Sequence, residues 1–341
     1  MPLILQEAVS LKALNSFGVE ARAARVVCIR APAELAELRE DPRVRDLPRL
    51  VLGAGSNVLF ARDFEGLVVQ MAIPGIEDLG IDGDARLVRV GAGESWPALV
   101  EKLVHDGRPG LENLALIPGS AGAAPIQNIG AYGLEIAERL HAVQTWDWAT
   151  GTATELAPEQ CEFGYRDSIF KRDRPGDRFI TSITLRLPLA WSPVTGYAEL
   201  ARELARDGLP GAVQPQDIFA AVCSLRRRKL PDPATLGNAG SFFKNPIVAR
   251  DQHARLIDRF PSLVSYPLAG GRFKLAAGWL VEASGMKGVT RGRAGVYEKQ
   301  ALVIVNRGGA SGRDILALAG EIQATVFERF GVALEPEAVI I

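Results

Sequence analysis

The stretch "IPGSAGAAPIQNIGAYG", residues 117–133, is the least ordinary segment of the chain. Its glycines alternate with Ala and Ser, so no bulky side chain shields the backbone. Such a loop can wrap a pyrophosphate with its N–H groups and needs no lysine. Ile117, Ile126, Ile129 and Tyr132 favour an ordered, half-buried loop over a flexible linker. The segment therefore predicts a phosphate-binding loop, although the chain contains no P-loop signature.

A second Gly-rich segment, "LGAGSNVLF" at residues 52–60, lies upstream of that loop. It is not the dinucleotide-binding pattern G-x-G-x-x-G, because residue 58 is Val. Gly53 and Gly55 still allow backbone N–H groups to approach a phosphate. Taken alone, the segment favours a plain strand-to-loop turn.

Downstream, "FGYRDSIFK" at residues 163–171 places charged side chains among aromatic ones. Arg166 can form a bidentate clamp on a carboxylate or on a flavin edge. A structural ion pair of Arg166 with Asp167 fits the same residues equally well.

Around these segments, short apolar runs bounded by turns predict an α+β protein. Strands are expected at 24–30, 49–57, 66–73, 85–93, 141–151, 178–189 and 332–341. Helices are expected at 32–40, 95–107, 215–229 and 314–331. Ser95 and Asp314 are the expected N-caps, and Gly107 and Gly331 the expected stops. The break "KLPDP" at 229–233 suggests a boundary near residue 230.

Length and composition narrow the class of protein. A chain of 341 residues suggests two or three domains. A net charge of −1 gives no global field that would attract nucleic acid or an anionic membrane. No apolar run reaches the ~18 residues of a membrane span. Cys28, Cys161 and Cys223 are odd in number and far apart, which predicts buried, inert thiols in a reducing cytoplasm and neither disulfides nor a zinc site.

The decapeptide "GNAGSFFKNP", residues 237–246, presents Ser241 between small residues and two Phe. A nucleophilic Ser needs a nearby base, yet the chain has only three His, none of them in a recognisable signature. This excludes a conventional serine hydrolase. Ser241 is then either a capping or turn residue, or a hydroxyl that donates a proton to a carbanion.

Taken together, these segments closely resemble the UDP-N-acetylenolpyruvoylglucosamine reductase (MurB) family, flavoenzymes of bacterial cell-wall synthesis. The resemblance also includes "NSFGVEARA" (15–23), "AAGWLVEASGMKG" (276–288), "AGVYEKQALVIVN" (294–306) and "LEPE" (334–337). The matching segments run in order over nearly the whole chain. Each is weak alone, and together they are very specific.

The resemblance implies three α+β parts. Residues 1–70 with 331–341, and residues 71–225, would form a two-part FAD-binding module of the vanillyl-alcohol-oxidase (PCMH) type. Residues 226–330 would form the substrate-binding domain. The final strand would return to the first part.

The resemblance also implies a reaction in two halves. NADPH would reduce non-covalently bound FAD, and UDP-N-acetylglucosamine enolpyruvate would then replace NADP. Hydride would pass from reduced flavin to the enolpyruvyl methylene, and Ser241 would protonate the adjacent carbon to give UDP-N-acetylmuramate. Arg166 and Glu337 match the family's residues that stabilise charge on the substrate carboxylate. No residue decides between NADPH and NADH.

Binding residues follow from the same resemblance. The substrate-binding candidates are Tyr165, Tyr197, Lys229, Asn245 and Gln300. Tyr197 indicates the longer of two family subtypes. The FAD-binding candidates are Gly53, Gly55, Ser56, Asn57, Pro118, Gly119, Ser120, Gly122, Ala123, Ile126, Asn128, Gly130 and Arg226. The chain departs from the family after "LEPE", where Ala338 and Val339 replace the usual Val-Arg.

Two other readings of the sequence stay open. Another FAD-dependent oxidoreductase of the same fold would explain residues 50–185, but not the decapeptide or "LEPE". A non-catalytic sugar-nucleotide-binding protein would explain the basic run "RRRK" (226–229) and Tyr197, but not a proton donor, an Arg and an acid at the family's positions. In every case we expect a monomeric protein that binds small molecules, with no metal, nucleic-acid or membrane partner.

Overall fold

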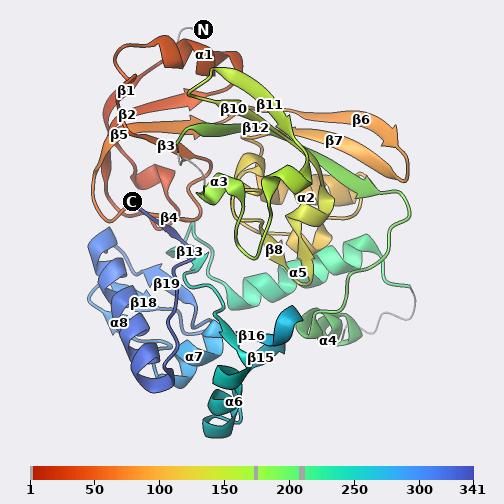
Figure 1. Cartoon of the computed structure of the whole chain (residues 1–341), viewed down its shortest axis with the longest axis vertical. Coiled ribbons are helices and arrows are strands. Elements are labelled where there is room, and N and C mark those ends of the chain that lie inside the picture. Colours follow the sequence, from red (N-terminus) through yellow and green to blue (C-terminus); the bar gives the residue numbers. More distant parts are fainter. Residues whose placement is uncertain (1–2, 173–175, 207–211) are drawn as a thin grey trace. The chain divides into compact units, whose positions relative to one another are not determined.

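The computed structural model describes residues 3–172, 176–206 and 212–341 (Figure 1). The chain divides into two compact units, and we describe each by itself. Unit 1 consists of Met1–Val9, Ala23–Gly55 and Phe64–Arg228. Unit 2 consists of Ser10–Arg22, Ser56–Asp63 and Lys229–Ile341.

The first sheet of unit 1 has the strand order β1-β2-β5-β3. Its strands are β1 (Gln6–Ser10), β2 (Arg22–Ile29), β5 (Phe64–Met71) and β3 (Arg49–Leu52). β2 and β3 both pair parallel to β5, as expected for strands joined through the helix α1 (Ala33–Glu40). Leu35 and Leu38 of α1 are buried in the same apolar core as Val27 and Val69.

The second sheet of unit 1 is antiparallel, with the order β11-β10-β12-β7-β6. Its strands are β11 (Thr152–Leu156), β10 (Leu140–Asp147), β12 (Arg178–Pro188), β7 (Ala85–Gly91) and β6 (Ile76–Asp82). The strand predicted for residues 178–189 is present as β12, and both of its faces contain buried residues, for example Ile183 and Leu185 on one face and Ile180 and Thr184 on the other. Phe179 packs against Trp146 and Trp148 and joins the cores of the two sheets.

Helices α2 (Trp96–His105), α4 (Ala198–Arg206) and α5 (Pro215–Lys229) contribute to the core of the second sheet. Ser95 occupies the N-cap of α2, as the sequence predicts. The predicted bounds of α5 are confirmed, and the chain leaves the helix at Lys229, before the "KLPDP" break. The remaining elements of unit 1 are β8 (Gly130–Ala131), β9 (Leu134–Glu135), α3 (Ile169–Arg172) and the 3₁₀ turns η2 (Glu112–Leu114), η3 (Ala121–Ala123), η4 (Ile136–Arg139) and η5 (Pro158–Cys161).

Unit 2 contains two antiparallel sheets. One has the order β13-β19-β18-β17, with β13 (Gly237–Ser241), β19 (Val303–Asn306), β18 (Ala294–Val296) and β17 (Thr290–Arg291). The other has the order β14-β16-β15, with β14 (Ile247–Ala249), β16 (Arg272–Leu275) and β15 (Ser265–Pro267). The remaining elements are α6 (Arg250–Arg259), α7 (Ala277–Ala283), α8 (Gly312–Phe330), η1 (Lys12–Leu14), η6 (Ala269–Gly271), and the paired strands β4 (Val58–Leu59) and β20 (Val339–Ile340).

Two local predictions at the C-terminal end are wrong. The N-cap of α8 is Ser311, whose hydroxyl accepts from the Asp314 N–H, and Asp314 is the third helical residue of a capping box. The predicted strand over 332–341 is reduced to β20 at Val339–Ile340. Its earlier residues leave the strand because the "LEPE" segment pairs with the decapeptide instead, as described below.

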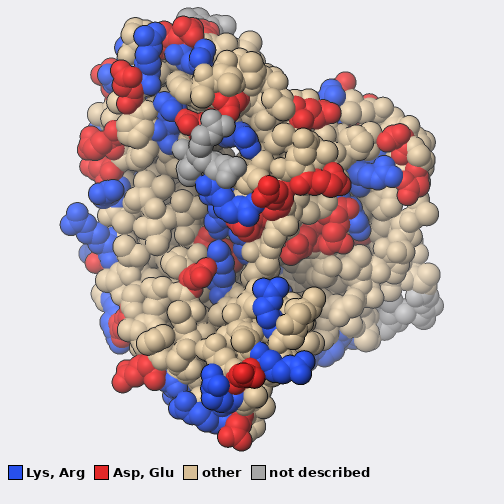
Figure 2. All heavy atoms as spheres, in the orientation of Figure 1, with Lys and Arg blue, Asp and Glu red and all other residues tan. Residues whose placement is uncertain are grey.

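The α+β fold class is confirmed by this mixture of helices and strands. Cys161 and Cys223 are buried as expected, and burial raises the pKa of the Cys161 thiol to about 11. Cys28 is only half-buried, which corrects the expectation for that residue. Among the helices that the structure describes, none is long and apolar enough to cross a membrane. On the face drawn in Figure 2, acidic and basic side chains are intermixed.

Candidate active site

The two Gly-rich segments of unit 1 lie against each other. A Cβ at Gly53 would lie 2.4 Å from Ser120 Oγ and 3.3 Å from Ala123 Cβ. Only glycine therefore fits at position 53 without displacing the second loop. The structure thus brings the predicted residues Gly53, Ser120, Gly122 and Ala123 into one backbone-lined region.

Backbone hydrogen bonds fix the second loop, which confirms that it is ordered. The Trp96 N–H donates to Gly119 O at 3.0 Å, and the Gly122 N–H donates to Ala92 O at 2.9 Å. A Cβ at Gly122 would lie 2.5 Å from Ala92 Cβ, so the loop sits directly on the segment that follows β7. Pro118 is exposed at the start of this stretch.

Arg166 occupies a tight turn that is anchored to the same loop. Its side chain donates to Gly130 O at 2.7 Å and lies over the Tyr165 ring at 5.5 Å. The Asn128 side chain donates to Gly164 O at 3.1 Å, and the Ser168 hydroxyl donates to Ile126 O at 2.6 Å. The turn that carries Arg166 is therefore held by three of the predicted cofactor contacts, Gly130, Asn128 and Ile126.

Arg166 has a φ of +55°, a conformation that costs energy in a residue with a side chain. Strain of this kind concentrates at functional positions, where the surrounding contacts impose it. Asp167, the alternative ion-pair partner proposed from the sequence, lies 3.5 Å from Arg172. The backbone conformation of the turn and the hydrogen bond to Gly130 O thus orient the Arg166 side chain.

Arg226, on α5, is a half-buried cation. Among the residues that the structure describes, its buried Nε has no hydrogen-bond partner. Burial lowers the pKa of Arg226, and Arg166 acts in the same direction. Such a group is costly to desolvate unless an anion compensates it.

Tyr197 contacts Tyr132, which interacts electrostatically with Arg226. Its ring meets the Tyr132 ring edge-on at 5.3 Å. Burial raises the pKa of Tyr132 to about 12, and Arg226 partly opposes this shift. Asn113 holds the Tyr197 segment in place, because its side-chain amide donates to Tyr132 O and Val194 O. Asn113 was not predicted from the sequence, because no motif around it marks it as a functional or structural residue.

In unit 2, Ser241 and Glu337 are brought together by backbone pairing. The Glu337 N–H donates to Phe242 O at 2.7 Å, and the Lys244 N–H donates to Glu335 O at 2.9 Å. Phe243 and Pro336 form an antiparallel bridge between them. The "LEPE" segment is thus an added strand beside the decapeptide, and Glu337 is opposite the residue that follows Ser241.

Ser56 and Asn57 belong to unit 2 in this structure. The Asn57 side chain donates to Glu337 O at 3.2 Å, and Asn57 O accepts from the Val339 N–H at 3.0 Å. Val339, at the position of the family's Arg, lies in β20 and is partly exposed, while Ala338 is buried. Asn57 is therefore a contact of the Glu337 backbone.

Asn245 and Gln300 flank the start of α7. Asn245 Oδ1 accepts from the Ala277 N–H at 2.9 Å. Gln300 Oε1 lies 3.4 Å from a Cβ built at Gly278, the second residue of the helix. Both predicted substrate-binding residues are therefore held at one helix N-terminus in unit 2. Lys229, half-buried, ends α5 and begins this unit.

The residues of unit 1 fit a bound dinucleotide cofactor. The two loops present backbone without side-chain cover, and two buried polar atoms in the described residues, Ser120 Oγ and Arg226 Nε, have no hydrogen-bond partner. A phosphate supplies the acceptors that such donors need. In the described parts of the chain, no group of three or more His, Cys, Asp or Glu side chains is arranged to hold a metal ion.

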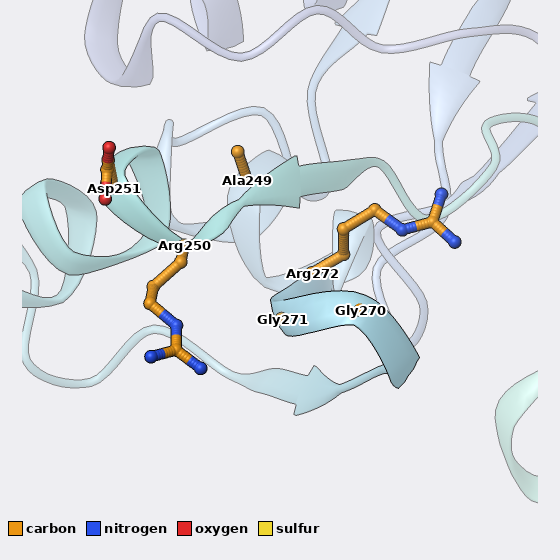
Figure 3. A pocket seen from close by; sticks show the side chains of 6 residues that line it. All are labelled: Ala249, Arg250, Asp251, Gly270, Gly271 and Arg272. Atoms are coloured by element: carbon orange, nitrogen blue, oxygen red, sulfur yellow. The ribbon is translucent and has the colours of Figure 1, made fainter.

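A separate open pocket of about 430 Å³ lies at the start of α6 (Figure 3). It is lined by Ala249, Arg250, Asp251, Gly270, Gly271 and Arg272. The guanidinium groups of Arg250 and Arg272 point in different directions in Figure 3. This pocket contains none of the site residues predicted from the sequence.

Comparison with known proteins adds independent findings. A family model described as "UDP-N-acetylenolpyruvoylglucosamine reductase, C-terminal domain" matches residues 232–341. A model described as "FAD binding domain" matches residues 23–157.

Curated relatives and a solved structure cover nearly the whole chain. A protein named UDP-N-acetylenolpyruvoylglucosamine reductase from Burkholderia mallei (strain NCTC 10229) is 54% identical over 331 residues, 97% of this chain and 95% of the relative. A protein of the same name from Ralstonia nicotianae is 54% identical over 330 residues, 96% of each chain. The crystal structure of UDP-N-acetylenolpyruvylglucosamine reductase (MurB) from Thermus caldophilus is 25% identical, has a TM-score of 0.66, and is matched over 100% of this chain and 99% of that one.

Proposed function

The chain belongs to the UDP-N-acetylenolpyruvoylglucosamine reductase family, and on that premise we propose how its residues carry out the family's reaction. The reaction is the NADPH-dependent reduction of UDP-N-acetylglucosamine enolpyruvate to UDP-N-acetylmuramate, a step of peptidoglycan precursor synthesis. The protein is an FAD-containing oxidoreductase, and FAD supplies the hydride-transfer chemistry when bound.

Ser241 is the proton donor in this proposal. The observation that supports it is the pairing of the decapeptide with the "LEPE" segment, which brings the backbones of Ser241 and Glu337 into one part of unit 2. The O–H bond of Ser241 breaks as a C–H bond forms on the substrate carbon, and the alkoxide regains a proton from water. Ser241 attacks no carbonyl, so it needs no His.

Arg166 stabilises the negative charge that spreads onto the substrate carboxylate during proton transfer, and Glu337 contributes as a carboxylic acid that donates a hydrogen bond. The strained turn of Arg166 supports this role, because a pre-oriented guanidinium loses little entropy when it pairs with a carboxylate. The backbone of Glu337 lies beside Phe242, the residue that follows Ser241, so both residues belong to the same part of unit 2.

The remaining site residues bind the two ligands. In this proposal the substrate is bound by Tyr165, Tyr197, Lys229, Asn245 and Gln300. The segments around Gly53, Gly119 and Gly122 line the FAD site, and Arg226 holds the FAD diphosphate. FAD is bound non-covalently, and Tyr197 assigns the chain to the longer subtype of the family.

Four further expectations remain part of the proposal. The protein is a monomer in the cytoplasm. It binds small molecules and has no nucleic-acid or membrane partner. The FAD-binding module consists of residues 1–70 with 331–341 and residues 71–225. Residues 226–330 form the substrate domain.

An anaerobic visible spectrum tests the proposal. It is recorded on purified protein, then after NADPH, and then after UDP-N-acetylglucosamine enolpyruvate. The expected result is a flavin band that bleaches with NADPH and returns only with this substrate. A band that stays bleached would indicate a different acceptor or an effect of the missing Arg at residue 339. A protein that cannot take up FAD would leave only the sugar-nucleotide-binding alternative.

A further inference from the structure

Asn238 is a buried polar residue three positions before Ser241, with 2% of its surface exposed. Its amide donates to Leu236 O at 2.8 Å and to Pro231 O at 3.2 Å. Its Oδ1 accepts from the Gly240 N–H at 2.9 Å. Both amide hydrogens and the carbonyl oxygen are therefore in use, although the reaction described above gives Asn238 no role.

The bond to Gly240 shapes the backbone that carries Ser241. An Asn side chain that accepts from the N–H two residues on forms an Asx-turn, which replaces a strand hydrogen bond by a turn. Gly240 has a φ of +69°, which glycine adopts without strain. Asn238 pairs with Val305 and Ser241 with Val303, so β13 has one more residue than β19 over this stretch. Such a bulge re-aims the next side chain, here Ser241.

The two donated bonds connect the same turn to the segment after Lys229. Pro231 lies two residues after Lys229 and is buried. The chain between Pro231 and Leu236 is a compact turn, in which the Leu236 N–H donates to Asp232 O at 2.9 Å. Asn238 thus spans both ends of this turn and holds it against the strand that carries Ser241.

We propose that Asn238 is a positioning residue that sets the orientation of the Ser241 hydroxyl and its placement relative to the Lys229 segment. It touches neither ligand in this proposal and acts through the bulge and the turn. The proposal rests on Ser241 being the proton donor. Its expected signature is a defect confined to the half-reaction that consumes the proton.

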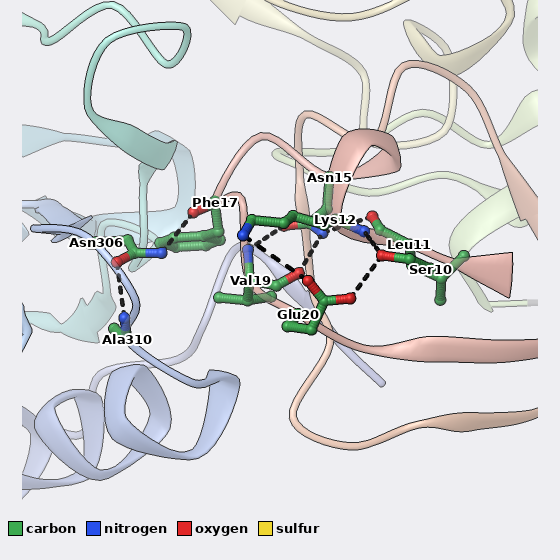
Figure 4. Close-up of polar contacts among 9 residues, drawn as sticks. All are labelled: Ser10, Leu11, Lys12, Asn15, Phe17, Val19, Glu20, Asn306 and Ala310. Carbon is green, nitrogen blue, oxygen red and sulfur yellow. Dashed lines mark hydrogen bonds and ion pairs between the residues drawn. The ribbon is translucent and has the colours of Figure 1, made fainter.

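Asn306 provides a matched control on the neighbouring strand β19. It is 7% exposed, and its Oδ1 accepts from the Gly308 N–H at 2.9 Å, again two residues on. It also accepts from the Ala310 N–H, and its amide donates to Phe17 O at 2.9 Å (Figure 4). Asn306 is paired opposite Gly237, so it stabilises the same sheet without shaping the turn before Ser241.

The experiment compares Asn238→Ala, Asn306→Ala and Ser241→Ala in the FAD-loaded protein by stopped-flow absorbance. Bleaching by NADPH and the return of the flavin band with the enolpyruvyl substrate are timed separately. Both Asn variants are expected to unfold at a lower temperature than the wild type. Their rates of bleaching by NADPH should stay within about twofold of the wild-type rate. Only Asn238→Ala is expected to slow the return, by about 100-fold, the cost of a displacement near 1 Å in a reacting group. Its return rate should also show a larger solvent deuterium isotope effect than that of Asn306→Ala.

A second variant keeps the test decisive if Asn238→Ala does not fold. The hydroxyl in Asn238→Ser can still accept from the Gly240 N–H, as in an ST-turn, but cannot reach both carbonyl groups. Asn238→Ser is expected to recover part of the rate at which the flavin band returns. Hydrogen exchange of the Gly240 amide is expected to stay slow. The proposal is overturned if either Asn238 variant slows the return no more than Asn306→Ala, or slows both half-reactions equally. If the flavin band of Ser241→Ala returns at the wild-type rate, the proton-donor assignment fails instead. The two failures are therefore distinguishable.

Discussion

At the scale of single residues, the pairing of Phe242 and Lys244 with the last residues of "LEPE" does most to define the site. Glu337 lies far from Ser241 in the sequence and near the end of the chain. A Glu there would normally be solvated. The added strand instead makes it half-buried and places its backbone beside the decapeptide.

Ser241→Ala is expected to separate the two half-reactions. Bleaching of the flavin by NADPH should be unchanged, because no proton from Ser241 enters it. The return of the band with the enolpyruvyl substrate should slow by about 100- to 10,000-fold, the usual contribution of a general acid. Stopped-flow absorbance measures both rates.

Ser284→Ala is the control for that variant. Ser284 donates to Leu280 O at the end of α7 and has no assigned role. Its rates should match the wild type. Loss of NADPH-dependent bleaching in Ser241→Ala, with FAD still bound, would contradict the proton-donor role.

Arg226→Met is expected to weaken FAD binding without lowering the stability of the FAD-free protein. Removing a buried cation whose Nε lacks a partner in the described residues should leave the unfolding free energy of the FAD-free protein unchanged or higher. The dissociation constant of FAD should rise about 10- to 100-fold, the value of a hydrogen bond to a charged group. Urea unfolding and flavin-fluorescence titration measure the two effects.

The neighbouring Arg227, which is exposed on the same helix, provides the control. Arg227→Met should leave the FAD affinity within about twofold. A loss of affinity as large as in Arg226→Met would mean that general positive charge, and not a specific contact, governs binding.

At the scale of the elements, α4 and α5 are joined by Glu203 and Arg228. Both carboxylate oxygens of Glu203 accept from Arg228, at 2.7 and 2.6 Å, and Ser224 donates to the same group at 3.2 Å. Glu203 is 7% exposed, while Arg228 reaches solvent. The Arg228 side chain holds the pKa of Glu203 below its usual value, and Ser224 adds to this shift.

The stability that Glu203 contributes should depend on pH. Because its pKa is lower in the folded state than in the unfolded state, the contribution is complete at neutral pH and is lost as the pH falls through those two values. Glu203→Gln should lower the unfolding free energy by about 1 kcal/mol near neutral pH. The difference from wild type should shrink in acid. Urea unfolding at about pH 7 and about pH 4 measures it.

Glu282→Gln is the matched control for this change. Its partner Lys287 lies at 2.8 Å, but the Glu282 side chain is largely exposed. An exposed pair of this kind contributes little, so its removal should change stability by less than about 0.5 kcal/mol at either pH. A pH-independent effect of Glu203→Gln would show that its charge is not what stabilises α4 against α5.

At the scale of the whole molecule, the proposed cofactor and substrate residues come from both compact units. The loops that fit FAD phosphates belong to unit 1, while Ser241, Asn245 and Gln300 belong to unit 2. Because FAD binds only the folded protein, it should stabilise unit 1 by mass action.

FAD at about 100 times its dissociation constant should stabilise the unit that binds it by about 2.7 kcal/mol. For a domain of 150–250 residues this corresponds to roughly 5–10 °C in the midpoint of thermal unfolding. Calorimetry with and without FAD measures the shift, and Arg226→Met at the same FAD concentration should show a smaller one. Hydrogen exchange that slows only in unit 2 on FAD addition would contradict the assignment of the loops.

The sequence alone determined many of the local elements. The expected bounds of α5, the stop of α8 at Gly331 and the presence of strand β12 follow from short-range periodicity and caps. The fold class and the family also follow from segments that the chain carries in order. The roles of Ser241 and Arg166 rest on the same segments and stay predictions.

Only the tertiary structure decided how distant segments meet. The pairing of residues 335–337 with 242–244, the contact of Gly53 with Ser120, and the anchoring of Arg166 on Gly130 all join parts of the chain that periodicity treats separately. The expected strand at 332–341 was wrong for the same reason, since residues 335–337 pair with the decapeptide. Secondary-structure propensity depends on a few neighbouring residues. Long-range pairing depends instead on which backbone N–H and C=O groups still need a hydrogen-bond partner once the local elements have formed.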